Sequence, residues 1–259
     1  MNDQSKTTLE LLKKELSICT LIADKYPKNY YCWTYRLNIV IDYSHMQQNK
    51  SEAVKQLMES EIQWITHVWL QQHVSDHSAA HYGGEILRMY LKLLKDDSGC
   101  DHASWKLQYL SKLMWDDKSS CKFYVEKFPS NEVVWIWRRI CSRLFLEFMS
   151  KQSKVVAVKE HLQIVNQFID NEVLSVLKRF DSESHGQENA SLYAKKYVSW
   201  NLKHFQMFQI EIGDNYQRIV DLFDASIESR DVLHKYWTGN VEKFFNVRNN
   251  GGNSQLITH

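Results

Sequence analysis

The residues best suited to chemistry in this chain lie together at Lys28-Asn29-Tyr30, just ahead of a periodic apolar segment. Asn29 can cap a helix that begins at Tyr30, because its side chain can accept hydrogen bonds from the first free N–H groups. A helix start beside an ammonium and a phenol hydroxyl suits an anion such as a phosphate. The alternative is a solvated Lys28 and a packed Tyr30, and general physics alone favours it because lysines are mostly exposed.

A second group with chemical potential is formed by His73, His77 and His81, which lie four residues apart. On one continuous helix they would share a face and could bind a metal. However, Asp76 is positioned as a helix cap between the first two, and no Glu follows a His as in H-E-x-x-H. We therefore interpret them as surface or cap histidines and assign no metal ligands to the chain.

The sequence contains no other motif that carries catalytic chemistry. It has no Walker loop, no G-x-G-x-x-G and no G-x-S-x-G, and its cysteines show no C-x-x-C pair. The cysteines are five in number, which is odd, and are best interpreted as reduced structural thiols. We assign no catalytic residue and no cofactor to this chain.

A short sequence phrase recurs along the chain and includes the helix start at Lys28-Asn29-Tyr30. It consists of a polar residue, then Trp four residues later and Arg seven residues later. The phrase is found at Asn29, Trp33 and Arg36, again at Asn131, Trp135 and Arg138, and more loosely at Lys196, Trp200 and Lys203. Another copy, near 76–83, keeps Asp76 but has Ala80 and Gly83 at the later positions. The starting residues are 47, 55 and 65 apart by subtraction. Such periods indicate helix pairs stacked in an array.

The phrase has a structural interpretation as the start of a helix. Asn29 caps it, Trp33 packs against the partner helix, and Arg36 can reach a carbonyl or carboxylate in the neighbouring repeat. Gly83-Gly84 lies within a helical stretch, so we interpret the Asp76 copy as a degenerated or kinked repeat.

The rest of the chain fits an all-α solenoid of antiparallel helix pairs. With 2 Pro and 8 Gly, the sequence favours long helices over turn-rich β structure. We expect one helical-repeat domain over residues 1–240, with repeat motifs near 29–36, 76–83, 131–138 and 196–203, and a disordered tail at 241–259. Helices are expected at 9–25, 30–45, 52–72, 78–95, 105–128, 132–149, 158–179, 193–212 and 215–235.

The charge balance gives no indication of a strongly charged partner. The chain has 32 Lys and Arg against 31 Asp and Glu, so no basic field points to nucleic acid. No run approaches about 18 uninterrupted apolar residues, and the first residues are polar, so we expect a cytoplasmic protein without a membrane span.

The phrase Asn-Tyr-x-x-Trp-x-x-Arg resembles the repeat of protein prenyltransferase alpha subunits. The resemblance covers about residues 8–205 and depends on the copies at Asn29, Asp76 and Asn131 in that order. It implies a right-handed superhelix of helical hairpins that wraps a separate beta subunit, which holds the zinc and the isoprenoid pocket. The partner would be a beta subunit of the Rab geranylgeranyltransferase type, and the substrate a protein with C-terminal cysteines.

The resemblance also implies a role for two residues. In farnesyl and type-I geranylgeranyl enzymes, the Lys and Tyr of a Lys-Asn-Tyr phrase lie at the active-site rim, with the Lys beside the isoprenoid diphosphate. The matching positions are Lys28 and Tyr30. Alpha subunits of this family carry further repeats before that phrase, so we interpret this chain as a short isoform, an incomplete gene model or a divergent relative.

We therefore expect a non-catalytic alpha-type subunit of a protein geranylgeranyltransferase, which attaches an isoprenoid to protein cysteines. The alternative is a tetratricopeptide-like scaffold that binds peptides and has no enzymatic role. That class predicts a period close to 34 residues, whereas the phrases here are more widely spaced.

Overall fold

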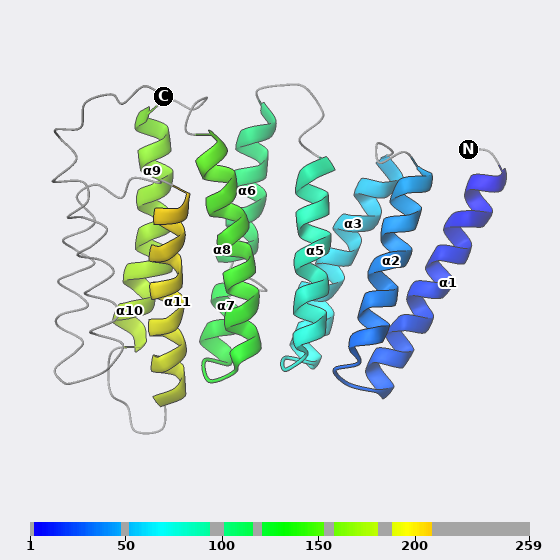
Figure 1. Ribbon diagram of the computed structural model, residues 1–259, viewed down its shortest axis with the longest axis horizontal. Helices are drawn as coiled ribbons and strands as arrows, with labels where there is room; N and C mark the ends of the chain where they lie inside the picture. The colour runs from blue at the N-terminus through cyan, green and yellow to red at the C-terminus, as the bar shows by residue number, and fades with distance from the viewer. Residues whose placement is uncertain are drawn as a thin grey trace, which may run out of the picture. The chain divides into compact units, whose positions relative to one another are not determined.

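The computed structural model describes residues 3–47, 52–93, 101–115, 121–152, 158–180 and 188–208 (Figure 1). Every regular element in these ranges is a helix, which confirms the all-α class. The chain divides into two compact units, Met1–Phe148 and Met149–His259. No helix in the described ranges is both long and apolar enough to cross a membrane.

The first unit begins with two helical hairpins. Helix α1 (Asp3–Lys25) packs against α2 (Tyr30–Met46). Helix α3 (Glu52–Trp64) continues through a π-helical turn, η1 (Ile65–Trp69), into α4 (Leu70–Gln72), and α3 packs against α5 (His77–Leu93). The unit continues with α6 (Asp101–Trp115), α7 (Cys121–Lys127) and most of α8 (Glu132–Gln152).

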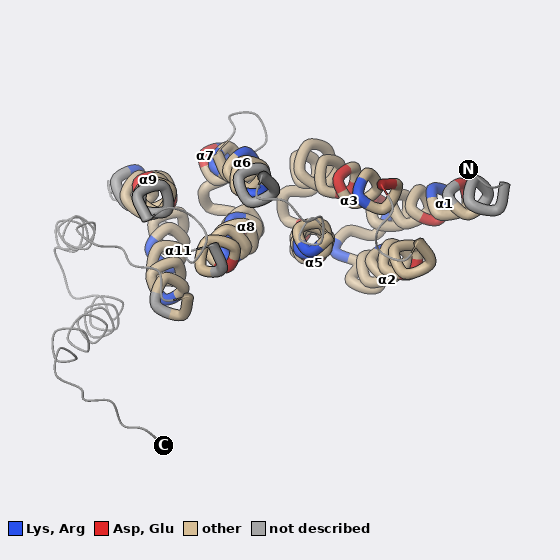
Figure 2. Tube along the Cα trace, turned by 90° about the horizontal axis from the view of Figure 1, so that it is seen from above, with Lys and Arg blue, Asp and Glu red and all other residues tan. Residues whose placement is uncertain are grey.

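These helices form two rows, which are visible when the molecule is viewed from above (Figure 2). Helices α1 and α3 lie in one row, and α2 and α5 lie in the other. Helix α2 also packs against α5, so the two hairpins are joined through that second row. The core between the rows is apolar and contains large aromatic side chains, and burying this area is the main stabilising contribution. It includes Leu16, Trp33, Val40, Met58, Ile62, Trp69, Tyr82 and Ile86.

The second unit contains α9 (Val158–Ile169), the π-helical turn η2 (Asp170–Leu174), α10 (Ser175–Phe180) and α11 (Glu188–Met207). Phe168 and Phe205 meet edge to face with ring centroids 5.7 Å apart. The buried Tyr197 hydroxyl donates a hydrogen bond to the Glu172 carboxylate. This unit therefore joins its helices through both an aromatic and a polar contact.

Some helix boundaries differ from the sequence-based expectations: α1 includes residues before 9, and α11 includes residues before 193. Of the helix expected over 105–128, the structure describes α6 and α7, and the residues between them lie outside the described ranges. The expected last helix at 215–235 and the tail at 241–259 also lie outside the described residues. A single repeat domain over 1–240 stays a prediction.

Candidate functional site

The turn between α1 and α2 positions the Lys28-Asn29-Tyr30 phrase. Pro27 follows the end of α1, and residues that precede a proline avoid the α region. Lys28 then adopts a φ of 63°, in the left-handed region, which side-chain-bearing residues rarely occupy. This turn brings Asn29 to the cap position of α2, where its Oδ1 accepts a hydrogen bond from Cys32 N at 3.2 Å.

The outer side of this helix start is exposed. Lys28 is exposed, the Tyr30 side chain is 64% exposed and the Tyr31 side chain is 82% exposed, with the two tyrosine rings edge to face at 5.9 Å. The backbone N–H groups of Tyr30 and Tyr31 belong to the first helical turn, where no intrahelical acceptor is available. An ammonium, two phenol hydroxyls and free N–H groups can together bind an anion.

The inner side of the same helix start is buried and polar. The indole N–H of Trp33 donates to Asp76 Oδ2 at 3.1 Å, and the indole N–H of Trp69 donates to the same oxygen at 3.2 Å. Asp76 Oδ1 accepts from Ala79 N at 3.1 Å. Asp76 is therefore both the cap of α5 and the acceptor that joins three helical segments.

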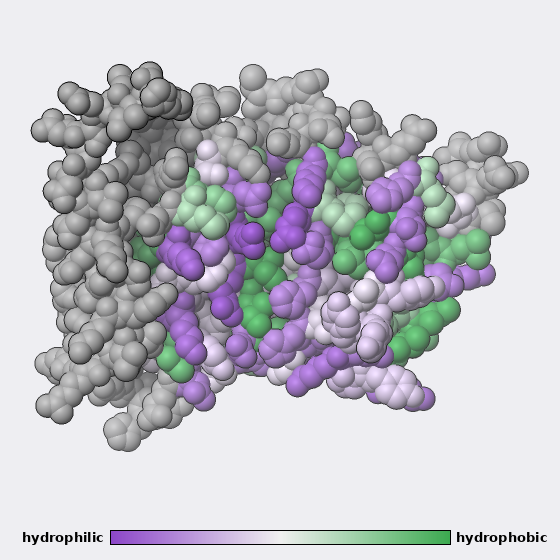
Figure 3. Space-filling view, in the orientation of Figure 1, coloured by the Kyte–Doolittle hydropathy of each residue, from purple (hydrophilic) through white to green (hydrophobic). Residues whose placement is uncertain are grey.

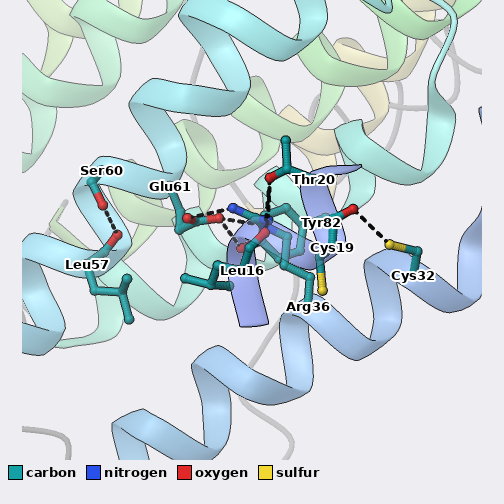
Figure 4. Close-up of polar contacts among 9 residues, drawn as sticks. All are labelled: Leu16, Cys19, Thr20, Cys32, Arg36, Leu57, Ser60, Glu61 and Tyr82. Atoms are coloured by element: carbon teal, nitrogen blue, oxygen red, sulfur yellow. Dashed lines mark hydrogen bonds and ion pairs between the residues drawn. The ribbon is translucent and has the colours of Figure 1, made fainter. Parts of the chain in front are cut away.

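Arg36 forms a buried ion pair in the first unit (Figure 4). Its guanidinium pairs with the Glu61 carboxylate in a two-point arrangement, with Nε to Oε2 at 2.8 Å and Nη2 to Oε1 at 2.9 Å. Its Nη1 donates to Leu16 O at 2.5 Å, and the Tyr82 hydroxyl donates to Glu61 Oε2 at 2.6 Å. These contacts connect α1, α2, α3 and α5 through the Arg36–Glu61 pair.

The electrostatics of this group keep the Arg36 guanidinium charged and the Tyr82 hydroxyl protonated. Burial lowers the pKa of the Arg36 guanidinium, but the Glu61 carboxylate and Tyr82 outweigh it and the net pKa is raised. Burial, followed by the Glu61 charge, raises the pKa of the Tyr82 hydroxyl well above its ordinary value. Tyr82 therefore remains a hydrogen-bond donor, and the group is a structural tether without acid–base chemistry.

The cysteines in this region are buried thiols. Cys32 Sγ donates to Cys19 O at 3.2 Å, which adds a contact between α1 and α2. Burial, followed by the neighbouring Cys32, raises the pKa of the Cys19 thiol to about 11. A thiol that stays protonated is a poor nucleophile, so this pair is suited to packing.

The sequence suggested that the copy of the phrase at Asp76 is a degenerated or kinked repeat, but the structure shows that its small residues have a packing role. Helix α5 is continuous through Ala80 and Gly83, and both are buried. A Cβ placed on Gly83 would lie 3.0 Å from Ile65 Cγ2 and 3.1 Å from Trp137 Cζ3, and one on Gly84 would lie 2.8 Å from Ile140 Cγ2. The glycines are therefore required by close side-chain packing around α5.

The phrase at Asn131 also begins a helix. Asn131 Oδ1 accepts from Val133 N at 2.9 Å, and its Nδ2 donates to Ser75 Oγ at 2.9 Å. Trp135 is buried, and its indole N–H donates to Pro129 O at 2.7 Å. Arg138 is also buried, with its guanidinium 5.9 Å from the Trp135 ring centroid.

The phrase at Lys196 does not begin a helix. Helix α11 starts at Glu188, so Lys196 lies in its interior and is exposed. Trp200 is half-buried against His204, with ring centroids 3.7 Å apart, and Lys203 is exposed. The spacing of Trp and Lys matched the phrase here, but the capping residue did not, and the cap determines where a helix begins.

The start of α5 separates His73 from His77 and His81, which both lie on α5. His73 ends α4 and its Nε2 lies 3.3 Å from Asp24 Oδ1, while His77 begins α5 with its Nε2 3.8 Å from Glu132 Oε2. Among the described residues, no group of three or more His, Cys, Asp or Glu side chains could hold a metal ion.

The sequence analysis missed Glu61, although its position carried a signal. It lies among the buried apolar residues Leu57, Met58 and Ile62, on the face of α3 that must enter the core. A charged residue on such a face needs a partner of opposite charge. The missing information was which arginine would reach it.

Comparison with known proteins identifies the class of repeat. The family model of the protein prenyltransferase alpha subunit repeat matches residues 12–41, which include Lys28, Asn29, Tyr30, Trp33 and Arg36. This confirms the resemblance to that repeat family. No solved structure matches the chain.

Three relatives share the name protein prenyltransferase alpha subunit repeat-containing protein. It is numbered 1 in Danio rerio and Homo sapiens and 1-A in Xenopus laevis. The Danio rerio protein is 26% identical over 144 residues, which is 49% of this chain and 32% of the relative. The Xenopus laevis 1-A protein is 27% identical over 176 residues, or 59% and 38% of the two chains. The Homo sapiens protein is 28% identical over 88 residues, or 34% and 20%. The matched part thus spans less than two fifths of each of these relatives.

Proposed function

We propose that this chain is a non-catalytic alpha-type subunit of a protein geranylgeranyltransferase in the cytoplasm. The observation that carries the proposal is the arrangement of the matched repeat at residues 12–41. Its Trp33 and Arg36 are buried in the stack, while Lys28 and Tyr30 are exposed at the helix start. A packing role accounts for the first two residues and leaves Lys28 and Tyr30 available to a partner or ligand.

In this proposal the partner is a beta subunit of the Rab geranylgeranyltransferase type, which supplies the zinc and the isoprenoid pocket. The reaction joins a cysteine sulfur near the C-terminus of a protein substrate to C1 of the geranylgeranyl group, and diphosphate leaves. The Lys28 ammonium, the Tyr30 hydroxyl and the first N–H groups of α2 would stabilise the negative charge of the diphosphate.

Assembly is tested by expressing the full chain with a Rab-type beta subunit and measuring molar mass by size-exclusion chromatography with light scattering. We expect a one-to-one heterodimer. A chain that elutes as a monomer beside a folded beta subunit contradicts the proposal and favours the peptide-binding scaffold.

The diphosphate role is tested in that heterodimer with Lys28→Ala. The expected result is an increase in the Kd for geranylgeranyl diphosphate of at least about tenfold, because a charged hydrogen bond contributes about 1.5–3 kcal/mol. The matched control is Lys25→Ala, which removes another exposed lysine of the same turn. Unchanged affinity and unchanged kcat in Lys28→Ala would contradict a role of Lys28 in diphosphate binding. The assignment as an alpha-type subunit would not be affected.

A further inference from the structure

Two turns between helices of the first unit are closed by a backbone hydrogen bond. In the α4–α5 turn Asp76 N donates to His73 O at 2.9 Å, and in the α7–α8 turn Asn131 N donates to Phe128 O at 3.0 Å. In both turns the donor is the residue that caps the next helix. A bond between residues three apart closes a tight turn, so each cap is fixed relative to the end of the preceding helix.

The α1–α2 turn, which carries Lys28, lacks this closing bond. The equivalent bond would run from Asn29 N to Tyr26 O, and none is present there among the described residues. Lys28 lies between these two residues in its left-handed backbone conformation. A residue keeps such a conformation only when the surrounding structure fixes its neighbours. Figure 3 shows mostly hydrophilic side chains over this turn, at the lower right of the view, so its outer side faces solvent and the fixing contacts come from its inner side.

The Trp of the repeated phrase holds these turns in different ways. The indole N–H of Trp135 donates to Pro129 O at 2.7 Å, an atom of its own turn. The indole N–H of Trp33 instead donates to Asp76 Oδ2 at 3.1 Å, in the neighbouring α4–α5 turn. The α7–α8 turn is therefore held by its own atoms, whereas the start of α2 is held by the next hairpin.

His73 makes the matching contact to the other side of the α1–α2 turn. Its Nε2 lies 3.3 Å from Oδ1 of Asp24, in the last turn of α1. Its ring stacks on the Trp69 ring, with centroids 4.1 Å apart and an interplanar angle of 23°, which fixes the orientation of the imidazole. Both turns lie at the same end of the helices, the lower end in Figure 1. The closed α4–α5 turn thus contacts α1 through its first residue and α2 through its last.

We propose that His73 is a positioning residue for the diphosphate subsite at Lys28 and Tyr30. The inference rests on the proposed function and adds that the second hairpin sets the geometry of the site on the first. His73 fixes the end of α1, Asp76 fixes the start of α2, and the α1–α2 turn has no closing bond of its own. Holding the Lys28 ammonium in place before the diphosphate arrives reduces the conformational entropy that is lost on binding.

The test measures the Kd for geranylgeranyl diphosphate in the heterodimer of the full chain with a Rab-type beta subunit. His73→Ala and Asp24→Ala should each raise this Kd about three- to thirtyfold, the range expected when a residue acts on a ligand through another residue. The matched control is His77→Ala, which removes a similar contact, 3.8 Å from Glu132, between α5 and α8. The Kd of this control should equal that of the unchanged chain.

A double-mutant cycle with Lys28→Ala separates positioning from simple stabilisation. If His73 acts by placing the Lys28 ammonium, His73→Ala should raise the Kd less in the Lys28→Ala chain than in the unchanged chain. Equal fold changes in the two backgrounds, no change in His73→Ala alone, or an equal rise in His77→Ala would overturn the proposal. An unchanged Kd in Lys28→Ala alone would instead overturn the proposed diphosphate role, and this inference with it.

A second measurement uses the full chain alone and does not require a beta subunit. Trypsin cleaves after lysine, so mass spectrometry can compare cleavage after Lys28 with cleavage after Lys127, at the α7–α8 turn. His73→Ala should raise the rate after Lys28 at least about threefold and leave the rate after Lys127 unchanged, because cleavage reports local opening. No change at either site, or the same rise at both, would overturn the positioning role whatever the outcome of the assembly experiment.

Discussion

The starts of α2 and α5 occupy equivalent positions in consecutive hairpins, yet they use the repeated phrase in opposite ways. Both begin with a side chain that accepts from the N–H three residues later, Asn29 from Cys32 and Asp76 from Ala79. At the seventh position after the cap, α2 has Arg36, which tethers four helices. Helix α5 has Gly83, which leaves room for Ile65 and Trp137.

This difference teaches that neighbouring copies of the phrase are complementary. The α2 copy supplies the large side chains, since Trp33 donates to Asp76 and its ring lies 5.3 Å from the Tyr82 ring. The α5 copy supplies the acceptor and the space. Departure from the consensus at Ala80 and Gly83 is therefore part of the packing, and it can be tested at each position.

Restoring the consensus at Gly83 should have the largest effect. Gly83→Arg would place a long, charged side chain where even a Cβ lies 3.0 Å from Ile65 Cγ2. Overpacking and an unpaired buried charge each cost several kcal/mol, so we expect a loss of more than about 5 kcal/mol and an unfolded or aggregated protein. Circular dichroism and size-exclusion chromatography measure this. A folded Gly83→Arg protein with unchanged stability would restore the interpretation of α5 as a degenerated copy.

Breaking the tether at Arg36 should have the next largest effect. Glu61→Ala leaves the buried guanidinium without its carboxylate, and such a loss costs about 3–5 kcal/mol. Urea unfolding followed by circular dichroism measures the change, with Glu10→Ala on the exposed face of α1 as a control expected within about 0.5 kcal/mol.

A compensated variant separates the unpaired charge from simple loss of packing. Arg36→Met/Glu61→Met/Tyr82→Phe removes both charges and the hydroxyl, so we expect it to be more stable than Glu61→Ala alone. If the triple variant is less stable than Glu61→Ala, packing and not charge pairing dominates this group.

The two caps should differ in their contribution to stability. Asn29→Ala removes one cap hydrogen bond beside exposed side chains and should cost about 1 kcal/mol. Asp76→Ala removes the cap and also leaves the Trp33 and Trp69 indole N–H groups without their acceptor, so we expect about 2–4 kcal/mol. Urea unfolding of both variants measures the difference, and equal losses would contradict the role of Asp76 as the shared acceptor.

The sequence predicted the helical class, the caps at Asn29 and Asp76 and the reach of Arg36, because these depend on local spacing and on the chemistry of single side chains. It did not predict the partner of Arg36, since Glu61 lies 25 residues away and the pairing depends on how α3 packs. Nor did it identify Gly83 as a packing residue, because an absent side chain has meaning only once Ile65 and Trp137 are placed around it.

The third phrase shows the limit of spacing alone. Trp200 and Lys203 match the positions of Trp33 and Arg36, but α11 had already begun at Glu188. Tyr197, which belongs to the same phrase, is instead the residue that contacts buried Glu172. The first unit has a similar contact, in which the Tyr82 hydroxyl donates to Glu61. Neither tyrosine–glutamate contact could be predicted from the sequence, because each depends on how the helices pack.

The smallest expected effect separates strain from binding at the start of α2. Lys28 precedes the cap in a left-handed conformation with φ 63°, whereas Ser75, which precedes Asp76, has no positive φ. Glycine adopts the left-handed region without steric cost, while it loses more entropy on folding, so Lys28→Gly should raise the free energy of unfolding by about 0.5–1 kcal/mol. Ser75→Gly relieves no strain and loses the hydrogen bond from Asn131, so it should lower that free energy.

The same two variants sharpen the functional assignment when stability and ligand affinity are measured together. Lys28→Gly also removes the ammonium, so a heterodimer carrying it should be more stable and yet bind geranylgeranyl diphosphate more weakly. A purely structural residue cannot give opposite signs, because relieving strain would leave binding unchanged or improve it. If Lys28→Gly raises stability without loss of affinity, the left-handed turn is only a connection between α1 and α2. If affinity falls while stability rises, the strain at Lys28 is retained because the side chain is used for binding.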